Sequence, residues 1–270
     1  MSGSNTEKAG LFSETARCLA ICDPEEKCLA TARLWQLLQA GEVLFDEHHV
    51  AAASVVCGRP EEPKLVEPGQ VPRRRLGSPQ GRAALVHAIA HIEFNAINLA
   101  LDAACRFRGM PENYYSDWLS VAADEARHFA MLRSRLCDLG HQYGDFTAHN
   151  GLWEMAEKTA DSCLKRMALV PRVLEARGLD VTPGMIDRLA QVGDHETIAI
   201  LEVILEEEVR HVEVGSRWFR YCCELEGLHP GTTFIDLLSE FFSGSIRGPF
   251  NIPARLRAGF SQQELDALCK

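Results

Sequence analysis

The chain has 270 residues, of which 46% are hydrophobic and 24% are charged. This composition is typical of a soluble globular protein, and it excludes disordered, fibrous and collagen-like chains. The formal net charge is −10 and the basic run Arg73–Arg75 is short, so we expect no nucleic-acid partner.

Two further features concern location and redox state. The opening residues MSGSNTEKAGLF lack the basic and then apolar pattern of a signal peptide, and charges interrupt the apolar runs before the roughly 18 residues that a membrane span needs. We therefore expect a cytoplasmic protein with no membrane partner. The ten cysteines form no CxxC pair, which favours reduced, mostly buried thiols over a zinc or dithiol site.

Helix signals begin early in the chain. Asp23-Pro24-Glu25-Glu26 combines an N-cap, a first-turn proline and a glutamate at the third position, and it predicts a first helix that ends at Gly41. Residues 58–79 hold five prolines and no apolar periodicity. We interpret this segment as a linker or a strap on the surface.

A first helical hairpin is predicted next. Apolar residues recur at helical spacing from Ser78-Pro79 to Arg108-Gly109, and Pro111 begins a second long helix that ends at Leu139-Gly140. Residues 140–151 are rich in Gly, Asp and Asn, and at about 3.3 Å each they can span roughly 40 Å. This segment is long enough to cross the length of a bundle.

A second hairpin follows the crossover. We expect a third helix over residues 152–177, an interruption at 178–182 and a resumption at Pro183. A fourth helix is capped by Asp194 and ends at Glu226-Gly227. The tail predicts a short helix over 234–242, a loop with the sequence GSIRGPFNIPAR and a capping box at residues 261–264.

These elements predict an all-α fold. Four long helices in two hairpins joined by one long crossover are typical of a ferritin-like four-helix bundle, although another helical protein with the same helix count stays possible. The expected parts are an N-terminal helical segment (1–57), the strap (58–79), the bundle (80–227) and a C-terminal extension that packs on the bundle (228–270).

The motif Glu-x-x-His occurs at Glu125/His128, Glu208/His211 and Glu226/His229. About one such motif is expected by chance, so the motif alone is weak evidence. Gly227 and Pro230 end the helix within the third copy, which excludes it. The first two copies lie within helices, where a separation of three residues places both side chains on one side.

Upstream glutamates repeat with the two motifs. Glu93 precedes Glu125 by 32 residues and Glu175 precedes Glu208 by 33. In an antiparallel hairpin, residues equidistant from the turn lie at one level, and these pairs are nearly symmetric about Gly109 and Gly193. All four carboxylates can therefore meet at mid-bundle, provided that the third helix resumes coaxially after its interruption.

Such a group of side chains predicts a metal centre. Buried carboxylates are costly unless they are paired or bind a cation, and carboxylates with imidazoles suit a pair of iron ions, with manganese as a second possibility. Pro171 is expected to disturb the third helix beside this centre. The predicted ligands are Glu93, Glu125, His128, Glu175, Glu208 and His211.

Other acidic and histidine residues are weaker candidates. His87 and His91 have the spacing of a metal-binding pair, but they face away from Glu93 on a helical wheel, so we do not expect them to be ligands. Glu154 and Glu157 do not mirror Glu208 about Gly193, and we expect them to be exposed or to lie outside the ligand set. Asp124, Asp194 and Glu207 are candidates to orient the ligating imidazoles.

Five stretches of the sequence are distinctive: AHIE (90–93), ADEARHF (123–129), GLWEMAE (151–157), RMALVPRVLEARGLD (166–180) and GPFN (248–251). Together they resemble an uncharacterised bacterial family of ferritin-like proteins of unknown function. The resemblance covers nearly the whole chain after about residue 15. It implies a ferritin-like bundle with a carboxylate-bridged di-iron centre.

One of these stretches also resembles a second family. Glu175-Ala176-Arg177 is similar to a motif of the tRNA-modifying di-iron hydroxylase, in which the glutamate is a ligand, and this implies the same role for Glu175. The chain departs from the family pattern at Arg127 and Arg210, beside the two ligating histidines, where smaller or apolar residues are commoner.

The resulting functional hypothesis is a di-iron oxidoreductase. It would use O₂ and an electron-donor protein to hydroxylate or oxidise an unidentified small organic substrate, and it could act as a homodimer. The alternatives are a ferroxidase or iron-handling protein, a tRNA-modifying hydroxylase, a bundle whose acidic cluster is structural, and a membrane-bound quinone hydroxylase, which the lack of an apolar surface helix disfavours.

Overall fold

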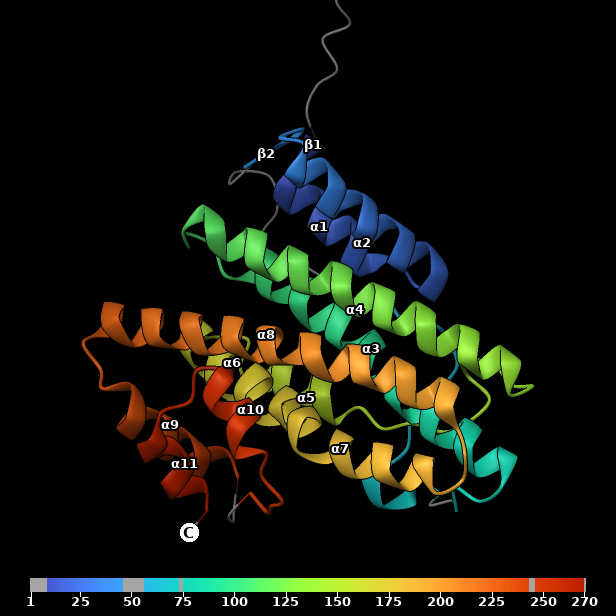
Figure 1. The fold of residues 1–270 in the computed structure, drawn as a ribbon. Coiled ribbons are helices and arrows are strands. Elements are labelled where there is room, and N and C mark those ends of the chain that lie inside the picture. Colours follow the sequence, from blue (N-terminus) through green and yellow to red (C-terminus); the bar gives the residue numbers. More distant parts are fainter. Residues whose placement is uncertain (1–8, 46–55, 73–74, 243–245, 270) are drawn as a thin grey trace, which may run out of the picture. The chain divides into compact units, whose positions relative to one another are not determined.

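The computed structural model describes residues 9–45, 56–72, 75–242 and 246–269, and these are mostly helical (Figure 1). Within them, the strands are limited to the short parallel pair β1 (Ala9–Gly10) and β2 (Val43–Leu44). The all-α prediction is confirmed. Arg73 and Arg74, residues 1–8 and 46–55 of the predicted N-terminal segment, and part of the predicted loop after residue 242 lie outside the described residues.

The helices have the following bounds. They are α1 (Leu11–Ala20), α2 (Pro24–Gln39), the 3₁₀ turn η2 (Pro68–Gln70), α3 (Pro79–Arg106), α4 (Glu112–Asp138), α5 (Gly151–Lys158), α6 (Cys163–Leu169), the π-helical segment η3 (Val170–Glu175), α7 (Ala176–Ala190), α8 (His195–Glu226), α9 (Pro230–Phe241), α10 (Ile252–Arg257) and α11 (Gln262–Leu268).

The chain divides into two compact units. Unit 1 contains Met1–Glu62 and His91–Ala130, and unit 2 contains Pro63–Ala90 and Met131–Lys270. Both α3 and α4 contribute residues to each unit. Every predicted ligand lies in a described helix. Glu93, Glu125 and His128 are in unit 1, and Glu175, Glu208 and His211 are in unit 2.

In unit 1, α1 and α2 are fixed to the hairpin of α3 and α4 by a buried lysine. The Nζ atom of Lys27 donates to the carbonyl oxygens of Leu19 (3.0 Å) and Gly58 (2.8 Å) and to Oδ1 of Asn98. Burial lowers the pKa of Lys27 to about 8. These three acceptors join α1, the segment after residue 56 and α3 at one point.

The first predicted helix is present as α2, and its N-cap is as expected, since Asp23 accepts from the backbone N–H of Glu26 at 2.8 Å. A further helix, α1, precedes it and was not predicted. Its buried residues include Leu11, Phe12, Cys18 and Leu19, which repeat at the spacing of one helix face.

Unit 2 is built around α8, which packs against α6, η3 and α7. Asp194 caps α8 as predicted, and Gly227 ends it in the left-handed conformation at φ 67°. The predicted crossover loop pairs with the strap, because the backbone N–H of Val66 donates to the carbonyl of Ala148 at 2.8 Å.

The predicted outline of the third helix is wrong in one respect. The interruption lies at residues 159–162, between α5 and α6, while α7 continues through residues 178–182 and through Pro183. Proline cannot donate to the carbonyl four residues before it, which is that of Leu179. The side chain of Asn251 donates to this carbonyl instead, at 3.1 Å, and so replaces the missing bond.

The C-terminal extension folds onto α7 and η3 within unit 2. Arg255 donates to both carboxylate oxygens of Asp180, at 2.9 and 2.7 Å, and both side chains are buried. The predicted capping box at Ser261 and Glu264 is present and begins α11.

Among the described residues, α3 is the one helix long and apolar enough to cross a membrane by length and composition, with a mean hydropathy of 1.3 over its best window. Within the folded chain, 78% of that window is buried. Such burial is typical of a core helix in a soluble protein.

Candidate metal centre

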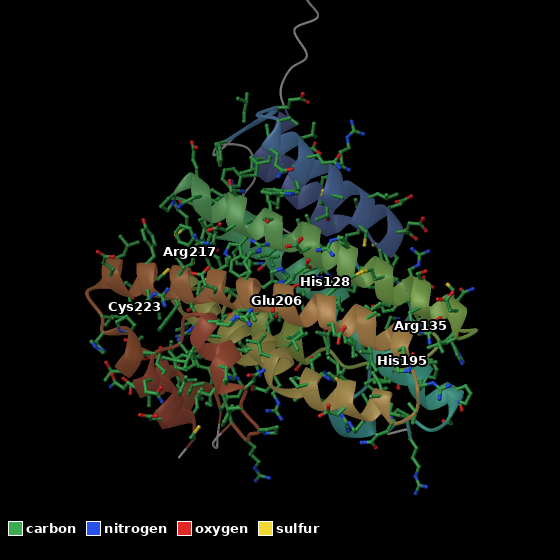
Figure 2. The ribbon with its side chains drawn as sticks, in the orientation of Figure 1. His128, Arg135, His195, Glu206, Arg217 and Cys223 are labelled. Carbon is green, nitrogen blue, oxygen red and sulfur yellow. The ribbon has the colours of Figure 1, made fainter. Side chains whose placement is uncertain are left out.

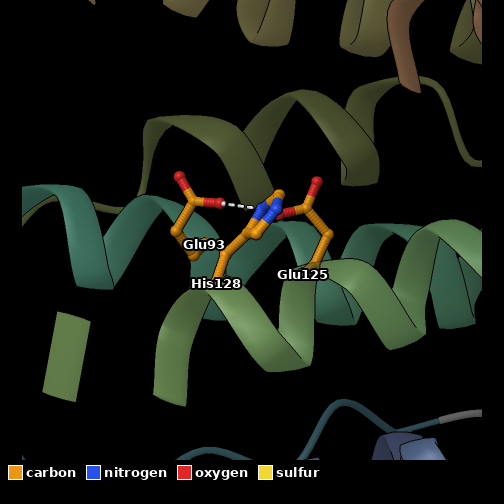
Figure 3. Close-up of side chains that lie close together, drawn as sticks. All are labelled: Glu93, Glu125 and His128. Carbon is orange, nitrogen blue, oxygen red and sulfur yellow. Dashed lines mark hydrogen bonds and ion pairs between the residues drawn. The ribbon is translucent and has the colours of Figure 1, made fainter. Parts of the chain in front are cut away.

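In unit 1, three of the predicted ligands lie together. Glu93 comes from α3, while Glu125 and His128 come from α4, and one ligand atom of each lies within 4.8 Å of the other two. Figure 3 shows their side chains pointing toward one another. The Nδ1 atom of His128 is 3.2 Å from Oε2 of Glu93 and 3.3 Å from Oε2 of Glu125.

The hairpin geometry explains this convergence. Glu93 and Glu125 lie sixteen residues before and after Gly109, which takes φ 73° in the turn between α3 and α4. Glycine readily adopts a positive φ, which permits a tight turn. In a hairpin with a tight turn, residues at equal distances from the turn lie at the same height along the two helices. The predicted alignment of Glu93 with Glu125 and His128 is confirmed.

The two carboxylates and the imidazole of this cluster are electrostatically linked. Burial and the neighbouring charge of Glu125 raise the pKa of Glu93 well above its usual range. Burial opposes protonation of His128, but hydrogen bonds to Glu125 and Glu93 outweigh it and raise the pKa of His128 to about 11. None of the three side chains is a permanent cation, so protons or a metal ion must balance the carboxylates.

The donor set also fits a metal ion by distance. Two neighbouring ligand atoms at right angles on an ion with bonds of about 2.1 Å are about 3.0 Å apart. The nitrogen-to-oxygen separations of 3.2 and 3.3 Å around His128 are close to this value. Carboxylate and imidazole side chains are ligands for several divalent metal ions.

Unit 2 contains the other three predicted ligands. The Nδ1 atom of His211 lies 3.2 Å from Oε2 of Glu208, so the second Glu-x-x-His motif uses the same nitrogen as the first. Both residues lie on α8 and are buried. Glu175, at the end of η3, is buried with 8% exposure.

The hairpin of α7 and α8 sets the register of these residues. Gly178 and Glu208 lie fifteen residues on either side of Gly193, and a Cβ added at Gly178 would be 3.9 Å from Cγ of Glu208. Pro171 and Gly215 lie twenty-two residues on either side, and they also touch. By the same count, Glu175 lies at the height of His211. The prediction was that Glu175 lies at the height of Glu208, which is one helical turn away.

The irregularity predicted at Pro171 is a π-helical segment. In η3 the backbone N–H of Ala176 donates to the carbonyl of Pro171, five residues earlier. Single π-helical turns are frequent at functional sites because they redirect side chains. Here the segment ends at Glu175, so it determines where this carboxylate points.

A buried arginine holds η3 in place, and the sequence analysis did not identify it. Arg172 donates to Oγ of Ser216 at 3.2 Å and to Oε1 of Glu264 at 2.7 Å. Its guanidinium lies over three rings, with centroid distances of 4.7 Å to Phe219, 4.2 Å to Phe234 and 4.5 Å to Phe260. Glu264 is distant in sequence, so no local pattern indicates this contact.

The weaker candidates take other roles. The Nε2 atom of His87 accepts from the backbone N–H of Gly144 at 3.0 Å, and burial lowers its pKa to about 4. His91 contacts Asn95, the residue one turn later in α3. Glu154 and Glu157 are exposed, as expected.

Two of the residues considered as imidazole-orienting groups have other partners. Asp194, at the start of α8, accepts a hydrogen bond from Arg135 at 2.8 Å. Figure 2 labels Arg135 and His195 at this end of α8. Asp194 is about 25 Å along the helix axis from His211. Asp124 pairs with Arg127 at 3.3 Å. Arg127 and Arg210 are both exposed. The role considered for Glu207 stays a prediction.

Comparison with known proteins places the chain in a family. The family described as "Protein of unknown function (DUF455)" matches residues 20–266. The chain belongs to the DUF455 family. This DUF455 protein is similar to an uncharacterized protein of Haemophilus influenzae, with 44% identity over 265 residues that cover 94% of this chain and 92% of the relative. No solved structure matches it.

The expected membership in a family of unknown function is therefore confirmed. In the DUF455 chain, each unit contains two buried glutamates and one buried histidine of the predicted ligand set. In each half-site, Nδ1 of the histidine faces the glutamate three residues earlier.

Proposed function

We propose that this DUF455 protein is a carboxylate-bridged di-iron oxidoreductase with a ferritin-like bundle, and that manganese can replace iron. The observation that carries the proposal is the repeated half-site, in which one upstream glutamate and one Glu-x-x-His motif occur in each unit. Two half-sites with three ligands each match the ligand set of a two-metal carboxylate centre.

In this proposal the residues that would hold the two ions are Glu93, Glu125 and His128 in unit 1 and Glu175, Glu208 and His211 in unit 2. When bound, reduced iron supplies the electrons for reaction with O₂, and an electron-donor protein restores them. The substrate class that fits is a small organic molecule that is hydroxylated or oxidised.

The side chains of this chain have three tasks. The carboxylates balance the metal charge, and Glu93 and His128 give up their protons as the metal enters, because protonated groups are not ligands. Phe94 and Phe129 follow two of these ligands directly, are buried, and contact each other at a ring distance of 5.4 Å. They form an apolar, buried contact between α3 and α4 next to these ligands in the sequence.

The net charge of −10 favours a small-molecule substrate over tRNA, because a polyanion needs a basic surface. A cytoplasmic location and a homodimer are parts of the same proposal. Iron handling remains the alternative that uses the same ligands, and it needs a large assembly that stores iron.

Oxygen consumption distinguishes the two functions. The anaerobically iron-loaded protein should consume about one O₂ per centre and then stop until a reductant and a substrate are added. Continued oxidation of added Fe²⁺ in a particle of many subunits would contradict the proposal. Glu157→Ala, in an exposed residue of the same unit as Glu175, is the matched control and should behave as wild type.

A further inference from the structure

The indole of Trp118 is a buried hydrogen-bond donor that lacks an acceptor. Trp118 lies on α4 in unit 1 and is 3% exposed. Its Nε1 atom has no hydrogen-bond partner among the described residues. The ring is well packed, with Tyr114 at a centroid distance of 6.4 Å. Because a buried donor without an acceptor destabilises a fold, this N–H group calls for an explanation.

Trp118 lies on the face of α4 that carries a predicted ligand. Seven residues separate it from Glu125, which is close to two full turns, so the two side chains leave the helix within about 20° of each other. The rise per residue places Trp118 about 10.5 Å from Glu125 along the helix axis, toward Gly109. The indole is therefore about two turns away from the predicted ligands of unit 1.

A stripe of small side chains continues the ligand face of α3. Three residues follow Glu93 by three, seven and ten positions, which is the spacing of one helix face. They are Ala96, Ala100 and Ala103, and each is at most 4% exposed. An alanine side chain is a methyl group, so this face has no side-chain atom that could accept from an indole.

The hairpin register places this stripe opposite Trp118. Ala100 and Trp118 lie nine residues on either side of Gly109. About one turn nearer to Gly109, the hydroxyl of Tyr114 donates to the carbonyl of Ala103 at 3.2 Å, which supports the same register to within one residue. The indole N–H therefore lies at the height of an apolar surface that leads along α3 to Glu93.

We propose that Trp118 is the hydrogen-bond donor of the substrate site, and that the substrate carries an uncharged carbonyl oxygen that accepts from Nε1. This assignment rests on the proposed function, because it places the substrate along the alanine stripe beside the predicted ligands of unit 1. An uncharged oxygen is favoured because one neutral donor offsets little of the cost of burying an ion. The substrate class is a small apolar ketone, aldehyde, ester or amide.

A buried water molecule is the other acceptor to consider. Buried waters typically make about three hydrogen bonds. The alanine stripe offers only methyl groups, and the carbonyl oxygens within α3 accept from N–H groups one turn later in the helix. A water at this position would be held mainly by the indole, whereas a carbonyl group needs only one donor.

The test uses the full-length, metal-free protein with ¹⁵N-labelled tryptophan, and acetophenone is the probe. α-Methylstyrene is the matched control, because a CH₂ group replaces the carbonyl oxygen in a molecule of the same shape. In calorimetric titrations we expect acetophenone to bind about tenfold more tightly than α-methylstyrene, which is the effect of one good hydrogen bond. Acetophenone should also shift the indole proton signal of Trp118 downfield.

Two variants separate the donor from the ring. Trp118→Phe keeps an aromatic ring and removes the N–H group, so it should bind the two probes with equal affinity, and its missing signal assigns the Trp118 indole. Trp153→Phe is the control, because Nε1 of Trp153 already donates to Glu157 at 3.0 Å, and it should retain the tenfold difference. The comparison of the two probes on wild type needs no variant, so it decides the question even if Trp118→Phe does not fold.

Four results would overturn the inference. They are equal affinity of wild type for the two probes, no saturable binding of acetophenone, a shift of another indole signal without one at Trp118, and a bound water at Trp118 that persists at saturating acetophenone. None of these measurements requires metal. A failed metal titration together with the expected probe results would refute the proposed function and retain Trp118 as the donor of a carbonyl-binding site.

Discussion

The close contact between α8 and η3 at Gly215 gives a sharp prediction of stability. A Cβ atom at residue 215 would lie 2.3 Å from Cγ and 2.4 Å from Cβ of Pro171. Ordinary contacts between carbon atoms are about 3.5–4.0 Å, so Gly215→Ala forces a shift of more than about 1 Å. Neither the proline ring nor the backbone of α8 can move away as a flexible side chain would.

Two opposing effects decide the size of the change. Overpacking in a closed contact costs about 1–3 kcal/mol, while replacing a helical glycine by alanine gains about 1 kcal/mol. We expect Gly215→Ala to lower the free energy of unfolding by up to about 2 kcal/mol. Gly184→Ala in α7 is the matched control, because a Cβ there meets no atom within 4 Å, and it should raise stability by about 0.5–1 kcal/mol.

Urea unfolding followed by circular dichroism at 222 nm measures both variants. Gly178→Ala tests whether a Cβ close to a predicted ligand is destabilising by itself. This Cβ would make only an ordinary contact with Glu208, at 3.9 Å, so the stability of Gly178→Ala should resemble that of Gly184→Ala. The reasoning is refuted if Gly215→Ala is as stable as Gly184→Ala, because the contact with Pro171 would then have no energetic effect.

Three further predictions concern charged residues. Burial lowers the pKa of Lys27 from 10.5 to about 8, so the unfolded state binds more protons than the folded state between these two values. The free energy of unfolding of wild type, relative to that of Lys27→Met, should therefore rise by about 3 kcal/mol between pH 7 and pH 11. A difference between the two proteins that does not change with pH would contradict this. Arg172→Met leaves the buried Glu264 unpaired and should cost about 3–5 kcal/mol in urea unfolding, whereas Arg257→Met, which removes an exposed pair with Glu206, should change little. Glu175→Ala should lower metal occupancy far more than Glu157→Ala, and equal losses measured by elemental analysis would show that the α7–α8 register is misread.

The sequence indicated the elements whose boundaries are set locally. Caps such as Asp23, Asp194 and Ser261 and the turn glycines Gly109 and Gly193 act within a few residues, so they can be read directly from the chain. Counting from Gly109 then sufficed to bring Glu93 and Glu125 together. The convergence of Glu93, Glu125 and His128 could therefore be predicted from the sequence.

The third helix shows where local signals fail. Gly178 and Pro183 both disfavour a helix, yet α7 continues through them because Asn251 supplies the hydrogen bond that Pro183 cannot give. Asn251 is 68 residues from Pro183 in the sequence. The contact of Arg172 with Glu264 is equally remote, and neither follows from spacing or propensity.

The α1 helix was missed for a different reason. Its buried residues Leu11, Phe12, Cys18 and Leu19 lie on one face, so a periodicity signal was present. The segment is short and its N-cap residue, Gly10, makes no side-chain hydrogen bond, so the usual start signal was absent.

The central claim is that the two half-sites bind two metal ions per chain. Anaerobic titration with Fe²⁺ followed by elemental analysis measures this most directly in wild type, His128→Ala, His211→Ala and Glu157→Ala. We predict about two ions per chain in wild type and in Glu157→Ala, with clear loss in both histidine variants. One ion per chain, or binding unaffected by either histidine substitution, would contradict the two-metal centre.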